Sequence, residues 1–97
     1  METQFDLELL GVKAELLKTI AHPVRLCIIQ GLLAKGECNV NHIQACLKIP
    51  QSTLSQHLAR LRSAGVVQGR RQGTEVFYQV VNDEAARVVK VLLGTDN

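Results

Sequence analysis

The sequence predicts a mainly α-helical protein with one small β-hairpin, and three observations lead to this fold class. Apolar residues recur every three or four positions through residues 6–64, which is the spacing of one face of a helix. After Gly65 apolar and polar residues alternate, as they do in a half-buried strand. The helical spacing returns in residues 83–93. A chain of 97 residues has room for one core, so we expect a single domain over residues 1–97 with the element order α-α-α-α-β-β-α.

The first two predicted helices are separated by His22 and Pro23. The first helix covers residues 6–21 and carries a wide apolar stripe. It ends there because the residue before a proline avoids the α region, and Pro23 then suits the first position of the second helix. The second helix runs to about Lys35 and ends at Gly36. Because it is apolar on nearly every side, we expect it to be the central buried helix.

A helix-turn-helix is predicted over residues 39–64. Asn39 is a good N-cap for a short third helix that ends near Lys48. A tight turn through Pro50 leads into a fourth helix, and this turn lacks the glycine that is often found there. The apolar face of the fourth helix consists of Leu54, Leu58 and Leu61.

The opposite face of the fourth helix is unusual, because an ordinary solvated face would carry Glu and Lys. It carries amides, hydroxyls and a histidine toward its N-terminus and cations further along. Amides and hydroxyls read base edges in the major groove of DNA, and a helix N-terminus attracts phosphate. A plain solvated face is the alternative interpretation. The residues predicted to contact DNA from this helix are Gln51, Ser52, Thr53, Ser55, Gln56, His57 and Arg60.

A basic hairpin is predicted directly after the fourth helix, over residues 66–81. Strand patterns lie on either side of a loop at residues 69–74, and Arg70 and Arg71 are in that loop. A helix-turn-helix followed by such a hairpin is a winged helix, so we expect both arginines to contact DNA phosphates, with Gln72 beside them also contacting DNA. Protection of an exposed strand edge is the alternative role of the two arginines.

Positive charge is concentrated in the middle of the chain. Between Cys38 and Thr74 there is no Asp or Glu, and five Lys and Arg residues give this stretch a charge of +5. Since the net charge is +2, the remainder carries −3. A basic middle between mildly acidic ends is typical of a surface that binds a polyanion, although a short chain can also cluster charges by chance.

The last predicted helix, residues 83–93, is capped by Asn82 or Asp83. This helix and the first one have apolar stripes without an obvious partner inside so small a core, so we expect them to form a dimer interface. Covering the monomer core is the alternative. The expected interface residues are Leu9, Leu16, Val88, Val89 and Leu92.

Other function classes have little support in the sequence. Three cysteines do not make a disulfide framework, and no apolar run approaches the roughly 18 residues of a membrane helix, so we expect a cytoplasmic protein without membrane contact. Ser52, Ser55 and His57 are close in sequence, but no carboxylate is near to orient the histidine. We therefore expect no catalytic residues, no enzymatic activity and no cofactor.

Three motifs make the chain resemble the ArsR/SmtB family of bacterial repressors. They are residues 15–26 (ELLKTIAHPVRL), 50–58 (PQSTLSQHL) and 71–78 (RQGTEVFY), within a likeness that covers about residues 6–93. The resemblance implies a homodimeric winged helix that binds an operator in double-stranded promoter DNA and blocks transcription. It also implies that the helix opening at Gln51 enters the major groove and that the first and last helices form the dimer interface.

The chain departs from the family pattern at the sites where relatives bind metals. Soft-metal sensors of the family carry a Cys-x-Cys pair at the positions of Asn39 and Asn41, and zinc sensors use Asp and His ligands on the last helix, which here has no His. Redox members pair a cysteine of the second helix with one in the last helix, but Cys27 has no such partner. We therefore expect none of the usual family metal sites and no metal ligands.

Two alternative functions remain open. Cys38, His42 and Cys46 follow one another at intervals of four residues, so a thiol- or metal-responsive repressor is one alternative. Against it, we expect Cys46 to be a small core residue beside Ile43 and Leu47. The other alternative is a winged-helix protein-interaction module whose basic face binds an acidic partner.

Overall fold

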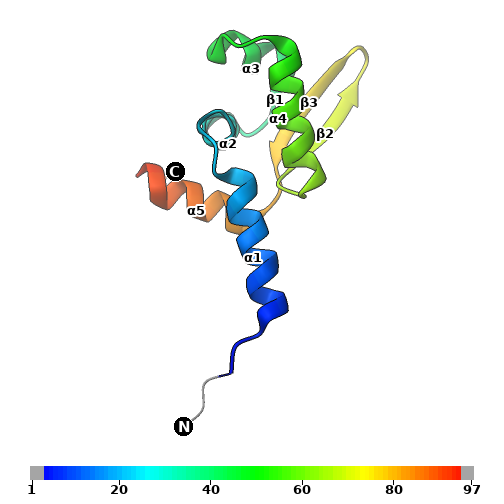
Figure 1. Ribbon diagram of the computed structural model, residues 1–97. Coiled ribbons are helices and arrows are strands. Elements are labelled where there is room, and N and C mark those ends of the chain that lie inside the picture. Colours follow the sequence, from blue (N-terminus) through cyan, green and yellow to red (C-terminus); the bar gives the residue numbers. More distant parts are fainter. Residues whose placement is uncertain (1–3, 95–97) are drawn as a thin grey trace.

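The computed structural model describes residues 4–94, which form five helices and a three-stranded sheet (Figure 1). In chain order the elements are α1 (Leu7–Ile20), α2 (Pro23–Lys35), β1 (Cys38–Asn39), α3 (Val40–Leu47), α4 (Gln51–Ser63), β2 (Val67–Gln72), β3 (Glu75–Val80) and α5 (Asp83–Leu93). The predicted winged helix-turn-helix is confirmed, with β1 added between the second and third helices.

Four helices begin at residues whose side chains cap free backbone N–H groups. Asp6 accepts from Leu9 at 3.1 Å, and the ring of His22 accepts from Val24 at 3.0 Å. Asn39 and Asn82 do the same for α3 and α5, each at 2.8 Å. These local contacts explain why the helix starts could be predicted from the sequence. Of the two cap candidates for the last helix, the structure uses Asn82.

The turn between α3 and α4 replaces the missing glycine with Lys48. Its backbone is left-handed, with φ 56° and ψ 41°, a conformation that costs energy for any residue with a Cβ atom. The Lys48 N–H donates to Gln44 O at 2.9 Å, and the Gln44 amide donates to Ile49 O at 3.2 Å. These two hydrogen bonds hold the tight turn that sets α4 against α3.

The sheet has the strand order β1-β3-β2, and both pairings are antiparallel. The two residues of β1 are too few to show a pattern in the sequence. The pairing of β2 with β3 continues as far as Gln72 opposite Glu75, so only Gly73 and Thr74 remain in the turn. The prediction that Arg70 and Arg71 lie in a loop was therefore wrong, since both lie on β2 and pair with β3.

The core forms around α2, as expected, with Ile28, Ile29 and Leu32 buried against α3, α4, α5 and β3. The largest completely enclosed side chains are Ile29, Leu32, Leu54, Leu61, Val66 and Val89. By contrast α1 projects away from the body, and Ile20 at its C-terminal end is its only buried residue (Figure 1).

Within residues 4–94 no single helix is long and apolar enough to cross a membrane, although α1 and α2 together, bent by 90°, would reach that length and composition as a broken span.

Candidate nucleic-acid interface

The recognition candidate, α4, has two faces of opposite character. Its three leucines are buried, with exposed fractions of 0% for Leu54, 3% for Leu58 and 0% for Leu61. This row fixes the rotation of the helix and turns the polar residues outward. Gln51, Ser52, Ser55, Gln56 and Arg60 are exposed, and Thr53 and His57 are half-buried. The N-terminal end of α4 and the tip of the hairpin lie at the same end of the molecule, away from the start of α1 (Figure 1).

The start of α4 also leaves backbone donors available. Its N-cap is Pro50, which forms no side-chain cap, and the first bond of the helix is from Leu54 N to Pro50 O at 3.1 Å. The N–H groups of the first turn therefore point outward beside Ser52 and Thr53 without a capping side chain. Such an end favours an anion.

The wing separates the two arginines that the sequence places side by side. Because side chains alternate along a strand, Arg70 lies on the outer face of the sheet with Phe77, and Arg71 lies on the face where Val67 is buried. On the outer face Arg70 donates to both carboxylate oxygens of Glu37, at 3.1 and 2.9 Å. It also donates to the Gln72 amide at 3.0 Å and stacks 5.3 Å from the centre of the Phe77 ring.

The contact between Arg70 and Glu37 changes the charge available on the wing. The hydrogen bond from Arg70 lowers the pKa of Glu37, and the same contact raises the pKa of Arg70, so both remain charged and paired. Glu75 returns to the same face and accepts from Asn39 at 3.0 Å. Of the two acids that border the acid-free stretch, Glu37 thus contacts the wing and Glu75 is part of it. Within residues 4–94 the side chain of Arg71 has no hydrogen-bond or ion-pair partner, so it is the available cation of the pair.

A second basic cluster, which the sequence did not indicate, joins the start of α2 to α4. Arg25 of α2 lies with Nη1 3.2 Å from Nδ1 of His57, and the rings of His22 and His57 are 4.4 Å apart. Burial lowers the pKa of His57, and the neighbouring basic side chains of His22, Arg25 and Arg60 lower it further. Arg25 was not predicted as a site residue. Its position as the only cation in the N-terminal half of an otherwise apolar helix was the available signal.

Known proteins are similar to this chain in both sequence and fold. The family described as bacterial regulatory protein, arsR family, matches residues 22–68. The biofilm growth-associated repressor of Agrobacterium fabrum is 48% identical over 79 residues, 81% of this chain and 67% of the repressor. The transcriptional repressor PagR of Bacillus anthracis is 46% identical over 79 residues, 81% of this chain and 79% of PagR. The chain belongs to the ArsR family.

Solved structures agree with this assignment. The crystal structure of PagR superposes with a TM-score of 0.81 at 42% identity, covering 90% of this chain and 99% of PagR. Reduced HlyU from Vibrio cholerae superposes with a TM-score of 0.82 at 35% identity, covering 88% of each chain. The resemblance to the ArsR/SmtB family is confirmed, and PagR is similar to this chain in both sequence and structure. Members of this family are DNA-binding transcriptional regulators, and so is this chain.

The end of this ArsR-family chain that is formed by α1 and α5 has an exposed apolar surface. Leu9 is 50% exposed and Leu92 is 63% exposed, whereas Leu16 and Val88 are half-buried against the core. Val89 is 0% exposed within the single chain. The expectation that Val89 faces a partner subunit was therefore wrong, because its side chain has no surface left to bury.

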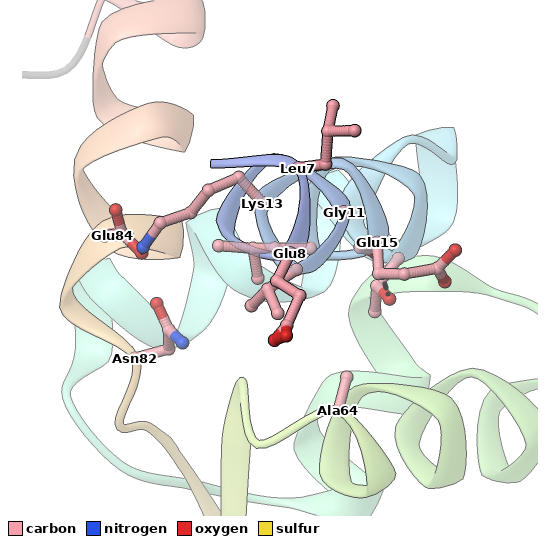
Figure 2. Close-up of a pocket in the computed structure, with 11 residues that line it drawn as sticks. Leu7, Glu8, Gly11, Lys13, Glu15, Ala64, Asn82 and Glu84 are labelled. Atoms are coloured by element: carbon pink, nitrogen blue, oxygen red, sulfur yellow. Dashed lines mark hydrogen bonds and ion pairs between the residues drawn. The ribbon is translucent and has the colours of Figure 1, made fainter. Parts of the chain in front are cut away.

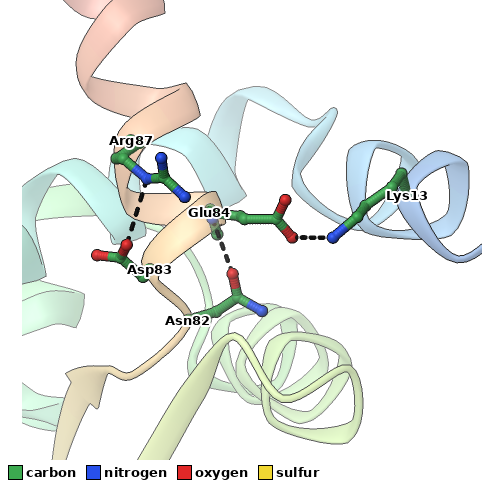
Figure 3. A network of polar contacts seen from close by, with 6 residues as sticks. Lys13, Asn82, Asp83, Glu84 and Arg87 are labelled. Atoms are coloured by element: carbon green, nitrogen blue, oxygen red, sulfur yellow. Dashed lines mark hydrogen bonds and ion pairs between the residues drawn. The ribbon is translucent and has the colours of Figure 1, made fainter. Parts of the chain in front are cut away.

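Polar contacts tie α1 to α5 beside this surface. The ion pair between Lys13 of α1 and Glu84 of α5 joins the two helices, and within α5 Arg87 pairs with Asp83 at 3.2 Å (Figure 3). Between α1 and the body lies an open groove, into which Glu8 points while Leu7 points away (Figure 2). Every residue of α1 from Leu7 to Val12 is exposed within the single chain.

The three cysteines of the chain line one small apolar pocket between α2 and α3. Cys38 is buried, whereas Cys27 and Cys46 are exposed. The expectation that Cys46 is a core residue was wrong, because Cys46 is exposed whereas Ile43, one turn earlier on α3, is buried. The Sγ atom of Cys46 lies 4.0 Å from Nε2 of His42. In the described part of the chain, no three His, Cys, Asp or Glu side chains lie close enough together to hold a metal ion.

Proposed function

We propose that this regulator is a repressor that binds an inverted-repeat operator in double-stranded DNA as a homodimer. The observation that carries the proposal is the outer face of α4, where amides and hydroxyls without any acid lie over a buried row of leucines. An acidic protein partner would need the cations but not the amides and hydroxyls, which are the groups that read base edges. The names of the relatives support repression, since PagR and the biofilm growth-associated proteins are repressors.

Each predicted DNA contact receives a role from its position. Gln51, Ser55 and Gln56 are exposed on the outer face of α4 and would choose the bases. Ser52 and Thr53 beside the uncapped helix start would bind phosphate together with the backbone N–H groups. His57 and Arg60 would act further along the helix, and the wing would add Arg71. Arg70 and Gln72 would contribute less, because each is engaged on the outer face of the sheet.

The proposed dimer would join the exposed surfaces of α1 and α5 around a two-fold axis. Leu9 and Leu92 would form its centre, and Leu16 and Val88 would line its edge. A two-fold arrangement of this kind sets two recognition helices about 34–36 Å apart, which matches successive major grooves on one side of the duplex.

Selection of bound genomic DNA fragments followed by sequencing tests this function. We expect recovery of an inverted repeat, a gel shift with that sequence at nanomolar protein, and a dimer in sedimentation experiments. The matched control is a duplex in which one half-site is scrambled. Failure to retain any duplex DNA, with binding to an acidic protein in its place, would favour the protein-interaction alternative.

A further inference from the structure

A groove between α2 and α4 gathers positive charge. It is lined by Arg25, Gln56, His57, Ala59, Arg60 and Ser63, with no acid among them. It adjoins the predicted reading face, because Gln56 belongs to both. In the described part of the chain, the side chain of Arg60 has no hydrogen-bond or ion-pair partner.

Arg25 is anchored in this groove on one edge and open on the other. Its Nε donates to the carbonyl of Thr19 at the end of α1. Its Nη1 lies 3.2 Å from Nδ1 of His57, and within residues 4–94 its Nη2 has no partner. A guanidinium can only donate, so Nδ1 of His57 must accept, and the ring is neutral with its proton on Nε2. The guanidinium is thus held in place with donors available for a ligand.

The groups that face His57 are all basic. His22 comes from the N-terminal cap of α2, Arg25 from its first turn, and Arg60 from the next turn of α4. From α1 only the Thr19 carbonyl enters the cluster, and Glu15, one turn earlier, is paired with Lys18. Basic groups that lie close together without an acid repel one another when they are charged. An anion bound between them offsets this electrostatic repulsion.

We propose that this groove binds one backbone phosphate of the DNA per subunit, with Arg25 and Arg60 as its cationic ligands and His57 as a third donor that takes up a proton on binding. This inference rests on the proposed DNA-binding function. The phosphate oxygen replaces Nδ1 of His57 as the acceptor for Arg25 Nη1. The freed Nδ1 binds a proton from solvent and donates it in a hydrogen bond to the phosphate.

The proton uptake fixes the direction of the pH dependence. In the free protein, burial and the basic side chains around it lower the pKa of His57, and a bound phosphate raises it. A group whose pKa rises on binding favours the complex at low pH, and the gain disappears as the pH rises through the pKa of the complex. DNA affinity therefore increases as the pH falls through the pKa that His57 has in the complex, and the total gain is roughly ten-fold per subunit for each unit by which binding raises the pKa.

The test measures binding of a labelled random-sequence duplex of about 30 base pairs by fluorescence anisotropy, over pH and over salt. His57→Gln removes most of the pH dependence, and His42→Gln on α3 is the matched control that keeps it. Because the groove neutralises one phosphate, the double variant Arg25→Gln/Arg60→Gln makes the slope of log affinity against log salt shallower by about 0.9 per subunit, and each single variant gives part of that change. Arg87→Gln on α5 leaves that slope unchanged. Because Arg60 is exposed and unpaired in the described part of the chain, its variant folds even if loss of the Arg25 anchor destabilises the chain.

The outcomes separate this proposal from the function on which it rests. Wild-type protein that binds the duplex with a pH dependence insensitive to His57→Gln, or a salt slope insensitive to both arginine variants, overturns the phosphate site and leaves the DNA-binding function intact. Absence of duplex binding by the wild type overturns the function itself. Titration with inorganic phosphate, followed by NMR of the His57 ring, identifies the source. A response to free phosphate with none to duplex overturns the assignment to the DNA backbone.

Discussion

The two ends of this molecule are both built from amphipathic helices, but they satisfy their apolar faces differently. At one end α4 buries all three of its leucines inside the chain, and its outward face is polar apart from Ala59. At the other end α1 and α5 leave apolar residues exposed: Leu7, Leu9, Leu10, Val12 and Leu17 on α1, and Val91, Leu92 and Leu93 on α5. A helix whose apolar face is buried within its own chain can present its polar face to DNA. A helix whose apolar face stays exposed needs a second protein surface that buries it.

The largest expected effect comes from a substitution that disrupts the exposed apolar surface of α1 and α5 and leaves the polar face of α4 unchanged. Leu92→Lys places a charge on a residue that is 63% exposed in the monomer, so the chain should fold and the dimer should dissociate. Because the second half-site then no longer adds its contribution, operator affinity should fall by about 10²–10³-fold. Sedimentation and gel shifts measure the two effects together.

Two matched variants sharpen this test. Gln79→Lys, on the exposed outer face of β3 opposite Gln68, adds the same charge outside α1 and α5 and should leave the dimer intact. Val89→Lys should unfold the chain, because that residue is enclosed in the core. A Leu92→Lys protein that remains dimeric would place the interface elsewhere.

The second effect concerns base choice at the polar end. Gln56→Ala should reduce discrimination between the operator and a mutated operator by about 1–3 kcal/mol for each base that the amide reads, with little change in binding to random duplex. The reason is that an exposed amide on α4 reads bases and does not carry charge. Competition binding measures both quantities. An equal weakening of binding to operator and to random duplex would mean that Gln56 contributes to phosphate binding only.

The third effect distinguishes the two arginines of the wing. Arg71→Ala should make the log affinity against log salt slope shallower by about 1.8 for a dimer, since it removes two free cations. Arg70→Ala should change the slope little, because Glu37 already neutralises Arg70. Glu37→Gln should steepen the slope by releasing Arg70. Equal slopes for the two alanine variants would show that the contact with Glu37 opens when DNA binds.

The smallest effect lies in the turn that sets α4. Lys48→Gly should stabilise the protein by about 0.5–1 kcal/mol, because glycine adopts the left-handed backbone without strain. Lys48→Ala retains the strain and removes the charge, so it should leave the stability almost unchanged. Thermal unfolding measures both. A Lys48→Ala protein stabilised as much as Lys48→Gly would assign the cost to charge and not to backbone conformation.

The sequence by itself determined the features that depend on near neighbours along the chain. The period of the apolar residues identified the five helices and the hairpin, and caps such as Asp6 and Asn39 act on N–H groups only a few residues away. The polar face of α4 was equally visible, because the three leucines that define its opposite face lie within two turns. The family motifs are short continuous segments for the same reason.

Only the tertiary structure decided the features that join distant positions. Glu37 reaches Arg70 across 33 residues and Arg25 reaches His57 across 32, so neither the neutralised arginine of the wing nor the basic groove beside α4 leaves a local pattern. Val89 and Leu92 belong to the same apolar stripe of α5, yet one is enclosed and the other exposed. The physical reason is that periodicity gives the direction of a side chain from its helix, whereas burial and pairing depend on which other element occupies the space in that direction.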